Sequence, residues 1–297
     1  MVTSGIVLAR EGSQFRVRTE QGDITATLRG RTKRHDGRAL PGDHVKLESS
    51  GSEWAITSVD ERRNVLARRE PGGRRERPLA ANLDQVFVMT ATRDPDPVLQ
   101  LIDRLLVLAE VDDIPAAVIV NKLDKDPGTG LIERMTRVGY EVFPVCVKAG
   151  IGLEALFQRM HGHISVVTGP SGAGKSSLLN ALQPGLGLRT AEVSERIGRG
   201  KNTTVTAQMI PLEEGGFLAD TPGLSEIRFW GLDPQQLVRS FPDLVRFVDD
   251  CKFPDCRHKT EPGCAVRKAV GTEIIADRYE SYLLFLDEIE SLPEDWE

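Results

Sequence analysis

The sequence lacks a long hydrophobic run and has few aromatic residues and few cysteines. Aromatic side chains make up 5% of its 297 residues, and there are four cysteines. The first apolar run, residues 6–9, is followed at once by Arg10, so we expect no secretory signal or membrane span at this end; no later run is long enough to span a membrane. With 40% hydrophobic and 28% charged residues, the composition predicts a globular, cytoplasmic protein of two or three domains.

A disulfide framework is also missing. Cys251, Cys256 and Cys264 fall within one 14-residue window, CKFPDCRHKTEPGC, and Cys146 stands apart. The window has the spacing C-x₄-C-x-H-x₅-C, which supplies three thiolates and the imidazole of His258, a complete tetrahedral set for zinc. The alternative is a group of reduced cysteines in a core. Because a full protein ligand set leaves no open position, the pattern predicts structural Zn²⁺ and not a catalytic ion.

Basic residues outnumber acidic ones only near the start of the chain. The net charge is −6, yet residues 1–80 hold 16 Lys/Arg against 11 Asp/Glu, which leaves 22 against 33 for the rest. Two segments supply most of this positive charge, RGRTKRHDGR (29–38) and RRNVLARREPGGRRER (62–77). They are either solvated loops or segments that contact nucleic-acid phosphates, and we favour the second hypothesis.

Short strands of period two fill residues 1 to about 62. Apolar and polar residues alternate in five places, separated by turn sequences such as EGS, EQGD and LPGD. Five such strands predict a small closed β-barrel, an OB-fold, although Src-homology-like barrels give the same pattern. We place the barrel at residues 1–65. The segment RREPGGRRERPLA has no periodicity, so we expect a basic linker at 66–80.

Strands and helices alternate in the next part of the chain. DQVFVMTA, AAVIVNK, EVFPVC and ISVVTG are near-continuous apolar runs typical of strands covered on both faces, and the segments between them have helical spacing. The alternation predicts a parallel α/β domain at residues 81–226. A helix-rich, Pro-interrupted region follows. Because it contains the cysteine window, we expect a helical zinc-binding domain at 227–297.

The octapeptide GPSGAGKS matches the phosphate-loop pattern G-x-x-x-x-G-K-[ST] and lies between a predicted strand and a predicted helix. We expect backbone N–H groups to bind the phosphates of a nucleotide, Lys175 to reach the β and γ oxygens, and Ser176 to bind Mg²⁺. The alternative, a Gly-rich turn without a ligand, leaves Lys175 unexplained. The residues expected at the phosphates are Gly169, Ser171, Gly172, Ala173, Gly174, Lys175, Ser176 and Ser177.

Two later segments stand where the switches of a GTPase belong. DTPGL follows the predicted strand GFLAD, so we expect Asp220 near the magnesium ion and the Gly223 N–H near the γ-phosphate. Alone, this pattern is also a common turn. The polar stretch GRGKNTTVT is expected to contain the first switch, with Thr203 or Thr204 closing over the metal.

The tetrapeptide NKLD follows a buried strand and has the side chains that recognise guanine. We expect Asn121 to bind the O6/N7 edge, Asp124 to accept hydrogen bonds from N1 and N2, and the stem of Lys122 to cover the ring. A bare N-K-x-D is often only a turn, but its position directly after AAVIV favours base recognition. CVKAG, after the next predicted strand, is expected to add a backbone N–H and Lys148.

The order of these motifs differs from that of an ordinary GTPase, in which the phosphate loop comes first. Here NKLD begins 48 residues before Gly169. A compact α/β domain whose ends lie close together can be cut in one loop and rejoined in another while its site is kept. The order therefore predicts a circularly permuted GTPase domain, in which the second switch leads directly into the C-terminal region.

Together these features resemble the ribosome small-subunit-dependent GTPase A (RsgA-type) family over nearly the whole chain. The barrel, NKLD before GPSGAGKS, DTPGL and CKFPDCRHKTEPGC form a joint pattern that is more specific than any part of it. The resemblance implies a GTPase that converts GTP to GDP and phosphate, slowly when alone and faster on the small ribosomal subunit. It implies a late assembly factor that binds rRNA through the barrel and the zinc domain and is released on hydrolysis. We expect a monomer and no membrane partner.

Two alternatives belong to other classes. One is an RNA-binding assembly chaperone in which GTP is mainly a regulatory ligand. The other, a metabolic kinase with a zinc domain, fits less well because the sequence has no signature of a second-substrate pocket.

Two residues bear on how water is activated. Leu224 stands where many GTPases have a glutamine that orients water, so intrinsic hydrolysis is expected to be slow. Similar family members often have K-H-T-T in the first switch, whereas this chain has Asn202 at the histidine position. Asn202 accepts a hydrogen bond from water but does not take its proton at neutral pH, so a histidine role does not carry over.

Overall fold

The computed structural model describes residues 1–29, 39–51, 53–69, 76–183, 207–213, 215–220, 229 and 232–291. Contacts divide the chain into two compact units. The first comprises Met1–Val86, Glu154–Thr168 and Ser176–Glu226, and the second comprises Phe87–Leu153, Gly169–Lys175 and Ile227–Glu297.

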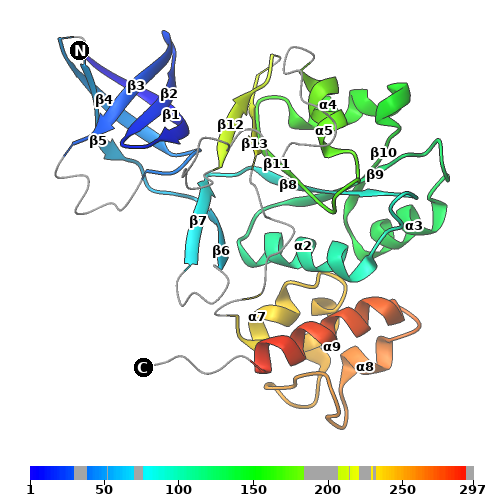
Figure 1. Ribbon diagram of the computed structural model, residues 1–297. Helices are drawn as coiled ribbons and strands as arrows, with labels where there is room; N and C mark the ends of the chain where they lie inside the picture. Colours follow the sequence, from blue (N-terminus) through cyan, green and yellow to red (C-terminus); the bar gives the residue numbers. More distant parts are fainter. Residues whose placement is uncertain are drawn as a thin grey trace. The chain divides into compact units, whose positions relative to one another are not determined.

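The five strands predicted near the N-terminus are confirmed and form a closed barrel in the order β1-β2-β3-β5-β4 (Figure 1). β3 and β5 are parallel and the other neighbouring pairs are antiparallel, which is the arrangement of an OB-fold. Alternate residues point inward, so the core contains Val7, Phe15, Val17, Val45, Leu47 and Ile56. The strands are β1 (Val2–Glu11), β2 (Gln14–Thr19), β3 (Gly22–Leu28), β4 (His44–Ser50) and β5 (Glu53–Val59).

The segment predicted as a linker contains two paired strands, β6 (Val65–Arg69) and β7 (Glu76–Ala81). Leu66 and Leu79 are 3% and 4% exposed, so both strands contribute side chains to a buried layer. The Pro-Gly-Gly sequence that suggested a linker lies between these strands. A few apolar residues among many arginines are too short a pattern to reveal a strand, which explains the difference.

Part of the basic sequence serves the fold of the first unit. Arg62 binds the fully buried Asp43 through two hydrogen bonds of 2.7 and 2.8 Å. Arg63 Nη2 donates to Asp84 Oδ1 at 2.7 Å, and Asp84 Oδ2 accepts the Ile164 N–H at 2.7 Å. These two arginines of the second basic segment therefore join the barrel and the hairpin to the start of β11.

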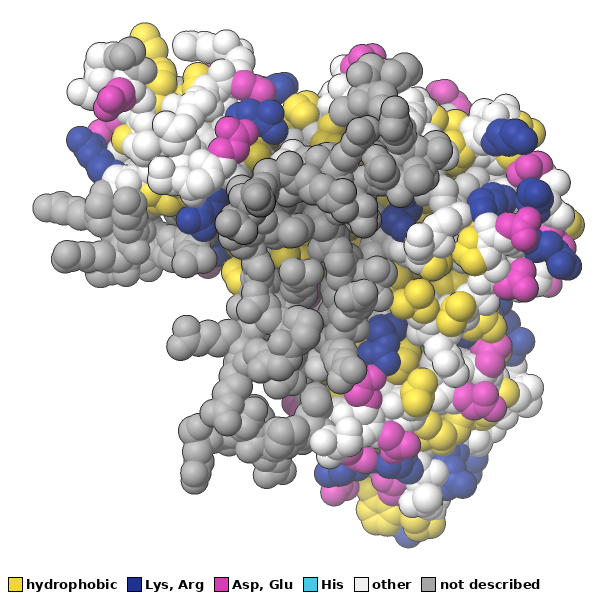
Figure 2. All heavy atoms as spheres, viewed as in Figure 1, with side chains coloured by type: hydrophobic (Ala, Val, Ile, Leu, Met, Phe, Trp, Pro, Cys, Tyr) yellow, Lys and Arg dark blue, Asp and Glu magenta, His cyan; other side chains and the backbone are white. Residues whose placement is uncertain are grey.

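Other arginines of the barrel are paired with acidic neighbours. Arg18 binds Asp23 across β2 and β3, and Arg29 binds Glu48. Figure 2 shows Lys/Arg and Asp/Glu side chains interspersed over the described surface of one face. Much of the basic sequence, residues 30–38 and 70–75, lies outside the described residues.

A six-stranded sheet has the order β10-β9-β8-β11-β13-β12. β9 and β10 are parallel, β11 and β13 are parallel, and β12 is antiparallel to β13. All seven residues of β8 are buried, as its continuous apolar run predicts. The elements are β8 (Gln85–Ala91), α2 (Leu99–Val111), β9 (Ala116–Asn121), α3 (Thr129–Val138), β10 (Glu141–Pro144), α4 (Leu153–Met160), β11 (Ile164–Thr168), α5 (Lys175–Leu182), β12 (Gln208–Pro211) and β13 (Phe217–Asp220).

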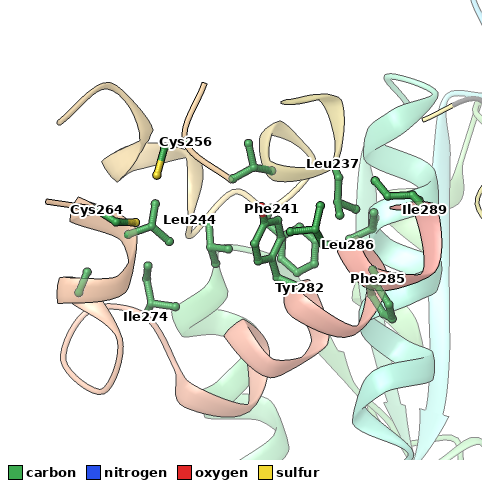
Figure 3. Close-up of a cluster of buried hydrophobic side chains, with 14 of the residues drawn as sticks. Leu237, Phe241, Leu244, Cys256, Cys264, Ile274, Tyr282, Phe285, Leu286 and Ile289 are labelled. Carbon is green, nitrogen blue, oxygen red and sulfur yellow. The ribbon is translucent and has the colours of Figure 1, made fainter. Parts of the chain in front are cut away.

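The C-terminal region is helical and packs around one apolar cluster. Its elements are α7 (Pro234–Arg239), the 3₁₀ helix η4 (Val245–Asp250), α8 (Ala265–Ala269) and α9 (Ala276–Glu290). Figure 3 shows Phe241, Tyr282 and Phe285 within the cluster and Cys256 and Cys264 toward one end of it. In the part of the chain that the structure describes, no helix combines the length and the apolar character needed to cross a membrane.

A buried ionic cluster joins α9 to α2 and α3 in the second unit. Asp103 of α2 is fully buried and accepts hydrogen bonds from Arg134 (2.9 and 3.1 Å), Arg278 (2.7 Å) and Ser281 (2.7 Å). Desolvation raises the pKa of Asp103, but Arg278 and Arg134 outweigh it, and the net pKa is lowered. Both oxygens of this carboxylate are therefore occupied by partners from two other helices.

Candidate nucleotide site and metal centre

The phosphate loop connects β11 to α5, as the sequence predicts. Its glycines are required by geometry at two positions. Gly169 has φ +144°, and a Cβ there would lie 2.0 Å from the Met89 carbonyl oxygen; Gly174 has φ +106°, and a Cβ there would lie 2.3 Å from Asn121 Nδ2. The loop therefore lies directly against β8 and against the residue that begins NKLD.

Lys175 is the first residue of α5 and lies over its own loop. Its ammonium donates to the carbonyl oxygens of Gly169 (2.7 Å) and Pro170 (2.8 Å). Partial burial lowers its pKa. The other predicted phosphate residues take three environments: Ser171 and Gly172 are exposed, Ala173 is buried, and Gly174, Ser176 and Ser177 are half-buried.

Asn121 connects three loops through one side chain. It is 3% exposed; its Nδ2 donates to the Ala173 carbonyl at 2.9 Å, and its Oδ1 accepts the Val147 N–H at 3.1 Å. The side chain therefore joins the guanine motif to the phosphate loop and to the 3₁₀ turn η1 (Val147–Ala149). An amide has a second N–H and a second lone pair, so capacity for a base remains.

Lys122 has an uncommon backbone conformation for a residue with a side chain, φ +66°. The Thr92 hydroxyl donates to its carbonyl oxygen at 2.8 Å, and its ammonium donates to the Asp94 carbonyl oxygen. The loop after β8 therefore contacts both ends of this lysine.

Asp124 is exposed, and its carboxylate is oriented by a thiol. Cys146 Sγ donates to Asp124 Oδ1 at 3.2 Å, and this bond is the largest contribution to the lowered pKa of Asp124, with Lys148 adding a weaker effect through its charge. Lys148 lies in η1 and is exposed. The sequence analysis missed Thr92 and Cys146. The signal for Cys146 was its position at the start of CVKAG.

The predicted switch residues are described only in part. β13 ends at Asp220, and Ala219 is paired with Val166 of the parallel strand β11, so both strands end at the same edge of the sheet. Nothing beyond the backbone of Asp220 is described. Thr203, Thr204 and Gly223 lie outside the described residues, as do Asn202 and Leu224.

The four predicted zinc ligands come together. The ligand atoms of Cys251, Cys256, His258 and Cys264 all lie within 4.8 Å of one another. His258 Nδ1 is 3.5 Å from Cys251 Sγ and 3.4 Å from Cys264 Sγ, and Cys251 Sγ is 4.0 Å from Cys264 Sγ. The sequence spacing thus gives a compact group of one nitrogen and three sulfur atoms.

The chemistry of this group fits a tetrahedral metal ion. Burial raises the pKa of the Cys256 thiol to about 12 and lowers the pKa of His258, so the pocket disfavours charged ligand atoms unless a cation shares it. The N–H groups of Ala265 and Arg267 each lie 3.4 Å from a cysteine sulfur, Cys251 and Cys264 respectively, and donate to it. Such donors stabilise negative charge on sulfur.

A comparison of sequences gives a consistent result. The sequence profile of the RsgA GTPase family matches residues 59–230. A protein of Gemmatimonas aurantiaca named small ribosomal subunit biogenesis GTPase RsgA is 44% identical over 299 residues, covering 97% of this chain and 97% of the relative. A protein of the same name from Moorella thermoacetica is 41% identical over 289 residues, covering 96% and 97%.

Solved structures agree with this fold. The crystal structure of YjeQ from Thermotoga maritima matches with a TM-score of 0.82 and 31% identity, covering 98% of this chain and all of the other. YloQ, described as a circularly permuted GTPase, matches with a TM-score of 0.78 and 28% identity, covering 98% and 96%. The predicted permutation is therefore confirmed.

Proposed function

The chain belongs to the RsgA GTPase family, and we propose that it is a late assembly factor of the small ribosomal subunit that binds rRNA and is released when it hydrolyses GTP. The name of its relatives supports the subunit. The observation that carries the proposal is the position of Asn121, whose amide joins the guanine motif, the phosphate loop and η1. Base and phosphate recognition are thereby brought into one site.

In this proposal each loop has one task. The phosphate loop binds the phosphates through its N–H groups, with Lys175 turning from its carbonyl partners toward the β and γ oxygens. Ser176, together with Asp220, would hold Mg²⁺, which lowers the charge that develops during phosphoryl transfer. Asn121 and Asp124 recognise guanine, and Lys148 lies beside the base. Thr203, Thr204 and Gly223 would close the site around the γ-phosphate.

Because Leu224 stands at the position of the water-orienting glutamine, we propose that hydrolysis by the protein alone is slow. The leucine side chain does not hydrogen-bond water, so a group from the ribosomal subunit is required to complete the site. In other GTPases such completion by a partner gives up to about 10⁵-fold acceleration. Hydrolysis would then act as a timer that starts only when the protein is seated.

The helical region would present a second binding surface with a fixed shape. Cys251, Cys256, His258 and Cys264 would hold structural Zn²⁺, which fixes the loop between η4 and α8. We propose that this region and the barrel contact rRNA, that the protein acts in the cytoplasm, and that it works as a monomer.

The test is single-turnover GTP hydrolysis at fixed salt by the protein alone, with small subunits, and with large subunits as the control. Acceleration by orders of magnitude with small subunits alone is expected. Equal rates in all three reactions would remove the timer and favour an RNA-binding chaperone that uses GTP as a regulatory ligand.

A second measurement separates binding from release. With a non-hydrolysable GTP analogue, the protein is expected to remain on the small subunit, whereas with GTP it dissociates after one turnover. Equal dissociation with both nucleotides would show that hydrolysis does not drive release.

A further inference from the structure

The turn that begins with NKLD lies between the loops that follow two neighbouring strands. β9, which leads into the turn, has β8 on one side and β10 on the other (Figure 1). Thr92 directly follows β8, and Cys146 is the second residue after β10. Because β9 and β10 run parallel, their following loops meet at one edge of the sheet. Positions 92 and 146 thus follow the two strands that flank β9 in the sheet.

Thr92 fixes the first half of the turn. Its backbone N–H donates to the Asn121 carbonyl at 2.9 Å, and its hydroxyl donates to the Lys122 carbonyl at 2.8 Å. Thr92 is 8% exposed, so little water competes for this bond. Lys122 has φ +66°, a conformation that a residue with a Cβ adopts only when its surroundings favour it. The hydroxyl of Thr92 supplies such a contact.

Cys146 fixes the second half. Its thiol donates to Asp124 Oδ1 at 3.2 Å, and it is 2% exposed. Its backbone is held by two hydrogen bonds with Ile151, of 3.0 and 3.1 Å. Among the described residues, no other side chain donates a hydrogen bond to this carboxylate and no cation lies within 4.0 Å of it. The thiol and the backbone N–H of Asp124 itself are therefore the donors to this carboxylate among the described residues, and the thiol makes the larger contribution to its lowered pKa.

We propose that Thr92 and Cys146 are positioning residues that set guanine specificity before the nucleotide arrives. Neither touches the base: Thr92 acts through Lys122, which covers the ring, and Cys146 acts through Asp124, which accepts from N1–H and the 2-amino group. Ordering these groups in advance removes part of the entropy cost of binding. The inference rests on the proposed recognition of guanine by NKLD and adds two residues outside that motif.

The two residues have different signatures. Loss of the Cys146 donor affects the carboxylate, so GDP, which has a 2-amino group, loses more affinity than IDP, which lacks it. Loss of the Thr92 hydroxyl affects Lys122, which covers the base of GDP and the base of IDP in the same way. The affinities of the protein for GDP and for IDP should therefore fall by the same factor. A single hydrogen bond of this kind changes affinity by about two- to tenfold.

The experiment measures the Kd of GDP, IDP and ADP for the full chain and its variants. Cys146→Ala removes the donor and Cys146→Ser keeps one; Thr92→Val removes the hydroxyl with little change of shape and Thr92→Ser keeps it. The matched control is Thr90→Val, because Thr90 on β8 is also buried, and among the described residues its hydroxyl bonds only the Ala91 carbonyl, at 3.4 Å.

The expected result is a lower GDP/IDP preference for Cys146→Ala, an equal loss for both nucleotides in Thr92→Val, and recovery in both serine variants. The Thr90→Val control is expected to bind all three nucleotides as the unmodified protein does. If the unmodified protein does not prefer GDP over IDP and ADP, recognition of guanine by NKLD is wrong. The other outcome is that the unmodified protein prefers GDP, but Cys146→Ala has the same nucleotide affinities as Cys146→Ser, and Thr92→Val has the same affinities as Thr90→Val. In that case only the positioning role is wrong.

Discussion

The nucleotide loops and the Cys/His loop are both irregular segments, but they are held in different ways. The nucleotide loops leave the ends of β8, β9, β10 and β11, and hydrogen bonds from Asn121 and Thr92 connect them. The loop between η4 and α8 has no regular element, and its ligands come from within 14 residues. The sheet orders the first region without a ligand, whereas in our proposal the second region is ordered by a metal ion in addition to its apolar packing.

The same contrast applies to burial. Asp124 and Lys148 are exposed at the surface of the nucleotide site, while Cys256, His258 and Cys264 are buried. A site that exchanges its ligand has recognition groups that water reaches. A structural site excludes water, and removal of its ion leaves buried polar atoms without compensation.

The largest effect is expected from removal of a metal ligand. Cys256→Ala should abolish zinc binding, measured as metal content per chain, and remove most of an ion contribution that is about 10 kcal/mol in small zinc domains. The helical region should then unfold at a lower temperature and subunit binding should be lost, while GTP affinity stays within about twofold. Cys146→Ser, outside the cluster, should keep its zinc. If Cys256→Ala lost zinc binding and GTP binding to the same extent, the two regions would not be held independently.

The next largest effect concerns the attachment of the helical region to α2. Asp103→Asn leaves two buried arginines short of a partner, which is expected to cost about 3–5 kcal/mol of unfolding free energy in urea denaturation. The control is Asp277→Asn, because Asp277 binds Arg134 from a side chain that is 45% exposed, and less than about 1 kcal/mol is expected. Similar values for both variants would show that burial of the cluster does not matter.

Substitution of a loop glycine tests the region ordered by the sheet. Gly174→Ala puts a Cβ 2.3 Å from Asn121 Nδ2 at φ +106°, so GDP affinity should fall by about 30-fold or more, equivalent to about 2 kcal/mol, with zinc content unchanged. Gly130→Ala in α3 meets open space and should instead stabilise the protein by about 0.5 kcal/mol. Unchanged GDP affinity in Gly174→Ala would show that the loop adapts.

The smallest effect is expected on the surface beside His258. Lys259 binds Asp287 (2.6 Å) and Glu290 (2.9 Å), and these side chains are partly exposed. Lys259→Ala should cost about 0.2–1 kcal/mol in thermal unfolding at low salt, and less at 1 M salt because ions screen the pairs. A larger cost, independent of salt, would mean that the surface pairs help to hold the metal loop.

Much of the fold could be predicted from local patterns. The five barrel strands, the apolar run of β8 and the helical spacing of α2 are all properties of neighbouring residues, so the sequence alone reveals them. The hairpin β6–β7 could not be predicted, because its strands are short and surrounded by arginines. Whether an arginine faces solvent or a buried carboxylate, as Arg62 faces Asp43, depends on residues distant along the chain.

The candidate sites divide in the same way. The residues of the motifs could be identified from the sequence alone. The ligand spacing in the Cys/His window and the order of NKLD and GPSGAGKS are both properties of positions along the chain. Thr92 belongs to no such motif, and Cys146 begins CVKAG, in which the sequence predicted roles only for a backbone N–H and Lys148. Only the order of strands in the sheet brings them to the turn after β9.

By itself the sequence determined which chemical groups this protein has and in what order: a phosphate-loop pattern, a predicted guanine motif placed before it, and a set of four predicted zinc ligands. The tertiary structure decided which of the remaining polar residues support those groups, from the Asn121 amide on the Ala173 carbonyl to the Asp103 carboxylate between two arginines. The physical reason is that a motif is defined by spacing along the chain, whereas a hydrogen bond is defined by a distance of about 3 Å, and only folding relates the two.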